Sequence, residues 1–307
     1  MAGFGESLTV QLGVDLNRLH ATIITFLPTK SRNRATGFDV SMVRLSMFKT
    51  IVWVSALCAA AAFPVLADQW SKTFSVGAAP ELRIETSDAN VTLRTANVQT
   101  IEARVYTSGW RIGPGDVHVM DHQMGDRVEI EVKVPALHFN LGNRWVKIEV
   151  QVPNTTKADV HTGDGNIRAD GLRGQTRLVT HDGNIDGQGF EGALEASSGD
   201  GNIRVRGKFS GLNLRSGDGN IDAEVAPGSH MATGWTVHTG DGGVTLRLPD
   251  GFAANLDAHT GDGSITVDLP AMADSNIHED SVSGRLNGGG QVLTVRTGDG
   301  SVHLARL

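Results

Sequence analysis

A six-residue motif that recurs through the second half of the chain constrains the fold more than any other feature. It reads Thr162-Gly163-Asp164-Gly165-Asn166-Ile167, recurs with few changes at residues 180–185, 198–203 and 216–221, and recurs more loosely at 239–244, 260–265 and 297–302. Successive aspartates of these copies are separated by 18, 18, 18, 23, 21 and 37 residues. A step near twenty residues is typical of stacked-coil proteins. The sequence therefore predicts an all-β fold, a parallel β-solenoid with about 18–23 residues per coil.

Aligning the copies gives three columns of mostly apolar residues that alternate with polar ones, as in strands with one buried face. The first column contains Ile167, Ile185, Ile203, Ile221, Val244, Ile265 and Val302. The second contains Ala169, Gly187, Val205, Ala223, Leu246, Val267 and Leu304. The third contains Leu178, Ala196, Leu214, Val237, Ala258 and Val295. One coil cannot bury its own apolar face, so we expect the coils to be stable only as a stack.

The chain before residue 155 follows the period less closely. Residues 85–91 read as a worn copy of the motif without its glycines, and we place the first coil there. Residues 108–154 contain two alternating runs, 128–134 and 146–152, each followed or ended by a proline. They predict a β-hairpin or small sheet inserted as a cap, followed by regular coils over 155–307.

The step of 37 residues between Asp262 and Asp299 is the longest in the series. It predicts two coils, the first of which has lost its motif. Residues 271–290 contain Gly284, Gly288, Gly289 and Gly290 and are expected to form a longer excursion. Because irregular surface loops often carry specific contacts, this excursion is a reasonable place for them.

The N-terminal segment predicts export. Lys49 precedes the apolar run 51–62, and Val65-Leu66-Ala67 gives a small-residue cleavage pattern, so residues 47–67 are expected to be a signal peptide. Residues 1–46 precede that signal and are expected to be a mis-assigned start or a disordered extension, since Met42 or Met47 is a better start. The mature chain, 68–307, is then a single β-solenoid domain without a transmembrane segment, in the periplasm, cell envelope or extracellular space.

Composition narrows the function classes. The only cysteine, Cys58, lies within the predicted signal, so the mature chain has no thiol for a disulfide or a metal site. Residues 68–307 carry 21 Lys and Arg against 31 Asp and Glu, a net charge near −10. Nucleic acid is therefore excluded as a partner, because phosphate binding needs a basic face.

The repeated Thr/Ser-Gly-Asp-Gly-x-Ile/Val turn, the Val152-Pro153 entry into it and the closing segment 286–304 resemble a bacterial β-strand-repeat family. That family is labelled "putative adhesin", a domain of unknown function found in exported envelope proteins, and the resemblance covers roughly residues 70–307. It implies a β-solenoid on the outer side of a membrane, with adhesion as the suggested role. Some relatives look like sensory or scaffold modules of envelope-stress systems. The resemblance implies no catalytic residues.

The aspartate column is the sharpest candidate site. Stacked strands lie about 4.8 Å apart, so the carboxylates would form an acidic ladder that must be solvated, paired or bridged by cations. An oxygen-rich ladder suits Ca²⁺, although no cofactor is the expectation for the chain. The alternative, which we favour, is turn chemistry, because Asp-Gly pairs tolerate left-handed backbone and the motif occurs only once per coil. The candidate calcium ligands are Asp164, Asp182, Asp200, Asp218, Asp241, Asp262 and Asp299.

The remaining motif positions are expected to hold the coils in register. The asparagines can form an amide ladder, and the Thr/Ser column can bond the turn backbone. Zinc pairs can be imagined at His161/Asp164, His238/Asp241 and His259/Asp262, but solvated histidines that offset the acidic ladder are the simpler interpretation. The structural turn and ladder residues are Gly165, Asn166, Gly183, Asn184, Gly201, Asn202, Gly219 and Asn220.

Catalysis finds little support in the sequence, because it contains neither a nucleophile elbow nor a zinc-protease motif. The primary hypothesis is a non-enzymatic exported binding protein, an adhesin or a cell-envelope protein, with a surface protein or glycan as partner. The alternative is an envelope scaffold or stress-sensing module. A third hypothesis is a glycan-active β-helix enzyme that uses outward carboxylates as acid and base. A catalytic site would need one coil that differs from its neighbours, whereas the aspartates recur uniformly.

Overall fold

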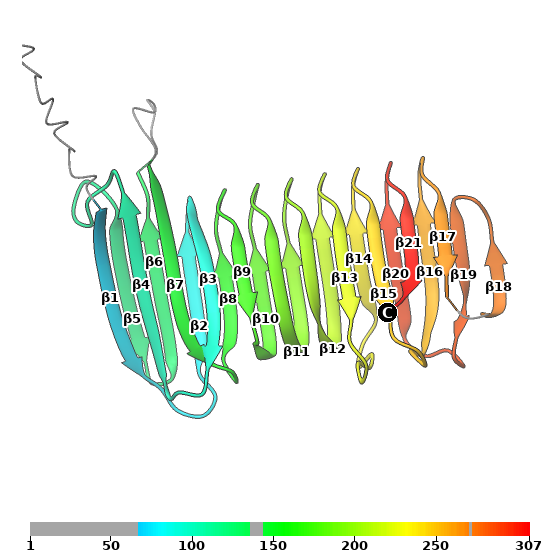
Figure 1. The fold of residues 1–307 in the computed structure, drawn as a ribbon, viewed down its shortest axis with the longest axis horizontal. Coiled ribbons are helices and arrows are strands. Elements are labelled where there is room, and N and C mark those ends of the chain that lie inside the picture. The colour runs from blue at the N-terminus through cyan, green and yellow to red at the C-terminus, as the bar shows by residue number, and fades with distance from the viewer. Residues whose placement is uncertain (1–66, 136–143, 270–271) are drawn as a thin grey trace, which may run out of the picture. The chain divides into compact units, whose positions relative to one another are not determined.

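The computed structural model describes residues 67–135, 144–269 and 272–307. These residues form 21 strands and no helix, so the all-β prediction is confirmed (Figure 1). The predicted signal peptide up to residue 66 and the upstream extension lie outside the described residues. Within the described part of the chain, none of the secondary structure is a helix with the length and hydropathy to span a membrane.

Most strands fall into two columns, one on each side of the repeated motif. The pre-motif column contains, in spatial order, β5 (His118–Met124), β6 (Arg127–Lys133), β2 (Glu81–Thr86), β8 (Lys157–His161), β10 (Arg173–Val179), the second halves of β11 (Ile185–Ser197) and β12 (Ile203–Ser216), β14 (Trp235–Thr239), β20 (Val292–Thr297), β16 (Ala254–Thr260), β19 (Ser281–Leu286) and β18 (Ala273–Ile277). The post-motif column contains β1 (Ala67–Ser75), β4 (Thr100–Ser108), β7 (Trp145–Pro153), β3 (Ala89–Ala96), β9 (Ile167–Asp170), the first halves of β11 and β12, β13 (Ile221–Val225), β15 (Val244–Leu248), β21 (Val302–Arg306) and β17 (Ile265–Asp268). We call a pre-motif strand, its motif and its post-motif strand one coil.

Equivalent residues of neighbouring coils lie directly against one another. Ile185 pairs in parallel register with Ile167 on one side and with Ile203 on the other. The three apolar columns of the sequence therefore line the space between the strand columns, and most of their members are under 2% exposed. Each buried Ile or Leu contributes roughly 1.5–3 kcal/mol, which a lone coil would forfeit. Ile265 and Val267 are only partly buried, because β17 is the last strand of its column.

The spatial order departs from the chain order at both ends of the stack. The coil formed by β2 and β3 lies between the β6–β7 coil and the β8–β9 coil. The coil formed by β20 and β21 lies between the β14–β15 coil and the β16–β17 coil (Figure 1). The first and last coils of the chain thus have a neighbour on each side, which buries apolar surface that a terminal coil would expose.

The prediction of a degenerate coil between Asp262 and Asp299 is wrong. Residues 273–286 form the antiparallel hairpin β18–β19, and β19 pairs antiparallel with β16. Asn287, Gly288 and Gly289 then take φ angles of +46°, +89° and +82°. These left-handed residues reverse the chain and return it to the far side of β16, where β20 pairs. The long excursion expected at 271–290 is this hairpin and its return, of which residues 270–271 are not described.

Antiparallel strands occupy both ends of the stack. At the N-terminal end, β1 pairs with β4, β4 pairs with β7, and β5 pairs with β6, all antiparallel. Residues 108–154 therefore contribute both an outer antiparallel strand and a coil. At the C-terminal end, β18 and β19 have the same arrangement on the pre-motif column. Such strands end the parallel stack without leaving a full coil face open.

Aromatic residues fill the interior near the second corner, where the post-motif strand turns into the next pre-motif strand. The ring centroids of Phe190 and Phe209 lie 6.4 Å apart, those of Phe209 and Trp235 lie 6.4 Å apart, and those of Trp235 and Phe252 lie 5.2 Å apart. All four side chains are buried. Tilted and edge-on contacts at these distances are the favourable geometries for aromatic pairs, so this file adds a further packed row to the stack.

Candidate functional site

The motif corner presents one exposed aspartate per coil. All seven predicted residues are exposed, and in space they follow the order 164, 182, 200, 218, 241, 299, 262, because the last coil is intercalated. Asp88 of the worn copy extends the row at its N-terminal end, since the backbone N–H of Asp164 donates to the Ser87 carbonyl at 3.1 Å. The sequence reading missed Asp88 as a member because its flanking glycines are absent. The result is an acidic ridge, not an enclosed site.

Asp88, at the N-terminal end of this ridge, has a raised pKa. Partial burial raises the pKa of Asp88 above its ordinary value, and the neighbouring Asp164 carboxylate raises that pKa further. Both causes disfavour the charged form of Asp88. The repulsion expected between stacked carboxylates therefore acts between Asp88 and Asp164.

Metal coordination has no assembled ligand set at this corner. Within residues 67–135, 144–269 and 272–307, no three His, Cys, Asp or Glu side chains are placed to hold one ion. Of the imagined zinc pairs, His161 directs its Nε2 to Asp159 Oδ1 at 2.8 Å and not to Asp164. His238 and His259 lie in a row with Arg215 and Arg296, with which they alternate across the stack. Those histidines line an outer strand face.

The motif asparagines form a chain of hydrogen bonds along the stack. Asn184 Nδ2 donates to Asn166 Oδ1 at 3.1 Å, and Asn184 Oδ1 accepts from both the backbone N–H and Nδ2 of Asn202. Asn220 continues the row from Asn202, and Asn166 is bonded in turn to Asn90 Oδ1. Because each amide needs its neighbour in the same register, the ladder ties a coil to the coils above and below it.

Buried Thr and Ser side chains bond the turn from the inside. Ser198 Oγ donates to the Gly183 carbonyl at 2.8 Å and accepts the Gly201 N–H at 2.9 Å. Thr180, Ser216, Thr260 and Thr297 each repeat both contacts in their own coils. Each hydroxyl thus links its own turn to the turn of the adjacent coil, as expected for polar groups that are buried.

The left-handed explanation of the motif glycines is wrong. The described non-glycine residues with positive φ are Asp274 and Asn287, and the glycines of the motif copies are absent from the positive-φ glycines as well. Close approach of the coils explains them instead. A Cβ on Gly201 would lie 1.9 Å from the Gly183 carbonyl oxygen, and one on Gly183 would lie 2.0 Å from the Gly165 carbonyl oxygen. The motif corner is therefore a packing device, built on residues that have no side chain.

The second corner carries a groove that the motif reading missed. Gly171, Gly189 and Gly207 follow one another at steps of 18 residues; Gly189 lies against Gly171 in the structure, whereas a register shift sets Gly207 opposite Phe190. They leave a hollow of about 560 Å³ with Phe190 in its lining. An adjacent hollow of about 520 Å³ is also lined by Gly171 and Gly189, so the two hollows form one groove along the stack. The regular glycine spacing was the available signal.

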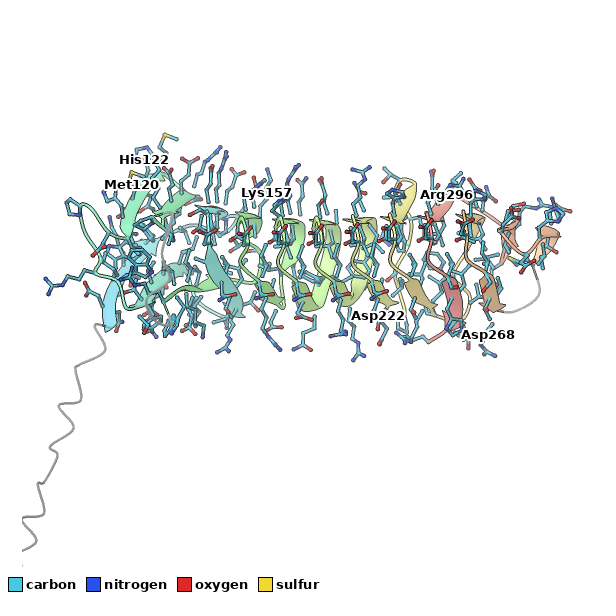
Figure 2. All side chains as sticks on the ribbon, turned by 90° about the horizontal axis from the view of Figure 1, so that it is seen from above. Met120, His122, Lys157, Asp222, Asp268 and Arg296 are labelled. Carbon is cyan, nitrogen blue, oxygen red and sulfur yellow. The ribbon has the colours of Figure 1, made fainter. Side chains whose placement is uncertain are left out.

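Four cations line the groove, Arg94, Arg173, Arg206 and Lys208, together with two carboxylates, Asp170 and Glu191. Arg173 is paired with Glu191 at 3.1 Å, and Arg206 with Glu224 at 2.5 Å. Arg94 lies beside Asp170 and Lys208 beside Glu191 in the register of neighbouring strands, without a salt bridge to either carboxylate. On the outer face of the post-motif column Asp222 projects away from the stack, opposite the face that carries Lys157 (Figure 2). The groove is thus a positive strip on a chain that is acidic overall.

Comparison with protein families matches residues 81–305 to the model described as Toastrack DUF4097, as the motif resemblance predicted. The search of curated proteins gave no match. Among solved structures, a putative cell adhesion protein from Clostridium sporogenes is 13% identical, covers 78% of this chain and 100% of its own, and superposes with a TM-score of 0.40. A putative adhesin from Parabacteroides merdae is 11% identical, with coverages of 77% and 96% and a TM-score of 0.43. A putative lipid binding protein from Parabacteroides distasonis is 12% identical, with coverages of 78% and 98% and a TM-score of 0.42.

Proposed function

The chain belongs to the Toastrack DUF4097 family, and we propose that it is an exported, non-enzymatic binding protein of the cell envelope, a β-solenoid that acts as an adhesin. The ligand that its surface suits is an extended, acidic envelope glycan. The observation that carries this proposal is the cationic groove at the second corner, which runs along several coils instead of closing around a small molecule.

The shape of the groove favours a polymer. Successive coils repeat about every 4.8 Å, so a ligand that lies along Gly171 and Gly189 meets a similar left-handed backbone turn at both steps. The absence of side chains at these positions lets the ligand approach the backbone closely. Arg94 and Lys208 provide two cations near the two ends of this path, and neither forms a salt bridge with the carboxylate beside it, Asp170 or Glu191.

A non-enzymatic role is supported by the uniformity of the carboxylates. An acid–base pair needs two groups in different environments, with pKa values that are pushed apart. The aspartates of the motif corner recur once per coil and are all exposed. Within the groove the carboxylates are engaged by arginines, as in the Arg173–Glu191 pair. The arrangement suits recognition of a charged chain better than cleavage of one.

The test is binding of the mature chain to acidic and neutral polysaccharides on an array. The variant Arg94→Ala/Lys208→Ala should lose most binding to the acidic polysaccharides, with a weaker salt dependence. The matched control is Lys157→Ala/Arg215→Ala, which removes the same charges from the outer face of the pre-motif column and should bind as the unmodified chain does.

Equal loss in both variants would mean general charge attraction, and the groove would not be the site. Release of sugar from any polysaccharide on the array would favour the glycan-active alternative. Co-purification of a protein from intact envelope, together with no polysaccharide binding, would favour the scaffold or stress-sensing alternative. Each of these outcomes contradicts the proposal.

A further inference from the structure

The outermost strand of the pre-motif column, β5, has an unusual outer face. Its inward residues are engaged with the rest of the protein: Val119 packs against the core, Asp121 pairs with Lys72, and Gln123 donates to the Ser75 carbonyl at 2.8 Å. Successive side chains of a strand alternate between faces, so the other four side chains point outward together. These outward residues are His118, Met120, His122 and Met124.

Packing does not account for this composition. Met124 is 58% exposed, and His118 and His122 are also exposed. Among the described residues β5 pairs with β6 and with no other strand, so β5 is an edge strand. An exposed edge strand is ordinarily protected by charged side chains, whereas this one alternates imidazoles and thioethers. Figure 2 shows Met120 and His122 projecting from the same face as Lys157.

A hollow in front of this face brings in acidic neighbours. Met120 lies opposite Glu131, and His122 lies opposite Glu129, in the register of the β5–β6 pair. All four side chains line a hollow of about 200 Å³. Glu129 is also paired with Arg127 at 2.7 Å, and Glu131 with Lys133 at 3.0 Å. The carboxylates are therefore already partly neutralised, which leaves the imidazole and the thioethers as the free donors.

We propose that the outer face of β5 binds a monovalent copper ion through the thioethers of Met120 and Met124 and the imidazole of His122. Thioether and imidazole donors together select soft copper over magnesium or calcium. Residues two apart on a strand are separated by about 6.6 Å, and the flexible methionine side chains can reach toward His122 from both sides. His118 stands next to Met120 as a further donor. The proposal does not depend on the glycan groove.

The site depends on methionine sulfur, because the nitrogen and oxygen ligands on this face do not suffice to hold an ion. The described residues contain no group of three His, Cys, Asp or Glu side chains that could hold an ion. Here the histidines are separated by Met120, so any site on this face needs sulfur to complete it. The prediction is thus specific for a soft metal.

The experiment uses the mature chain, kept reduced and free of oxygen, in competition with a chromogenic copper(I) chelator. The unmodified chain should remove about one equivalent of copper from the chelator. Met120→Leu/Met124→Leu should weaken binding by roughly tenfold or more, since even neighbours of metal ligands change affinity tenfold to a hundredfold. His122→Gln should weaken it as well. Silver(I), a redox-inert probe, should shift the methyl NMR signals of Met120 and Met124.

The matched control is His230→Gln/Met231→Leu, which removes the same residue types from the connection between β13 and β14. This variant should bind copper(I) as the unmodified chain does. No transfer of copper from the chelator, or equal loss in the control, would overturn the proposal. The proposal would also be wrong if the unmodified chain took up no copper(I) and the Met120→Leu/Met124→Leu variant still bound Zn²⁺. Thermal melts of each variant distinguish lost binding from lost folding. The exchanged side chains on β5 all lie on its solvent face, so we expect the variants to fold.

Discussion

At the motif corner a Cβ on Gly201 would lie 1.9 Å from the Gly183 carbonyl oxygen, whereas at the groove corner a Cβ on Gly189 would have no non-neighbouring atom within 3.4 Å. Gly189, in contrast, has a φ of +69°, while Gly201 is not among the residues with positive φ. The same residue therefore serves two purposes in one coil. Gly201 lets neighbouring coils touch at the motif corner, and Gly189 turns the chain at the groove corner and leaves an open surface there.

The largest expected effect follows from that contrast. Gly201→Ala should destabilise the protein by at least about 3 kcal/mol, because the new methyl group meets backbone of the adjacent coil that cannot move independently. Gly189→Ala should cost only about 1 kcal/mol, the cost of a left-handed alanine. Urea denaturation of both variants measures the difference.

Asparagine at the two positions sharpens the comparison further. Gly189→Asn should be milder than Gly189→Ala, because asparagine tolerates the left-handed region. Gly201→Asn should be at least as damaging as Gly201→Ala, because the obstacle there is volume. If asparagine rescued both positions alike, the close-approach explanation of the motif glycine would be wrong.

The second effect tests the amide ladder, which belongs to the motif corner alone. Asn184→Ala removes the acceptor of the two bonds from Asn202 and the donor to Asn166. We expect a loss of about 1–2 kcal/mol, since the Asn202 backbone N–H keeps no partner from the adjacent coil at that point. The control is Gln175→Ala, which removes an exposed side-chain amide on β10. It should leave the free energy of unfolding unchanged in the same denaturation experiment.

Much of this architecture could be predicted from the sequence, because a period of two and a step of 18 residues encode which side chains turn inward. Ile167, Ile185 and Ile203 lie in the buried column as expected. The intercalation of the first and last coils could not be predicted, since every coil carries nearly the same motif and so offers nearly the same surface to any neighbour. Only Asn287 and the two glycines after it mark the reversal that inserts β20, and they look like any other loop.

The candidate sites, like the fold, could be predicted from the sequence only in part. The motif drew attention to the aspartates, whose seven positions proved to be exposed and repetitive. The groove depends on Gly171, Gly189 and Gly207, which repeat just as regularly but in the half of the coil without a conspicuous motif. The ligand-type residues of β5 lie outside the repeat altogether. Periodicity finds what recurs, and it does not distinguish the one coil or strand that differs.

The third effect is a pH dependence at the end of the acidic ridge. Because the pKa of Asp88 is raised in the folded protein, the folded state holds this proton more tightly than the unfolded chain does. The stabilisation from this bound proton is fully present below the pKa of Asp88 in the unfolded chain, near 3.8. It is lost as pH rises through the pKa of Asp88 in the folded protein. Asp88→Asn should therefore be slightly more stable than the unmodified chain at pH 7, by less than about 1 kcal/mol because solvent screens the charge. The difference should vanish below pH 3.8; a constant difference across this range would contradict the assignment.

The smallest expected effect concerns calcium at the motif corner. A calcium site needs six to eight oxygen ligands around one ion, and each coil offers a single exposed carboxylate whose turn carbonyls are already used by the Thr and Ser hydroxyls. We therefore expect the melting temperature to be the same within about 1 °C in Ca²⁺ and in chelator, since ligand that binds both states equally or weakly adds no stability. Mg²⁺ at the same ionic strength controls for screening of the ridge. A rise specific to Ca²⁺ that disappears in Asp200→Asn would show that the motif corner binds as well as packs, and the contrast between the two corners would then lie only in the sign of the charge they bind.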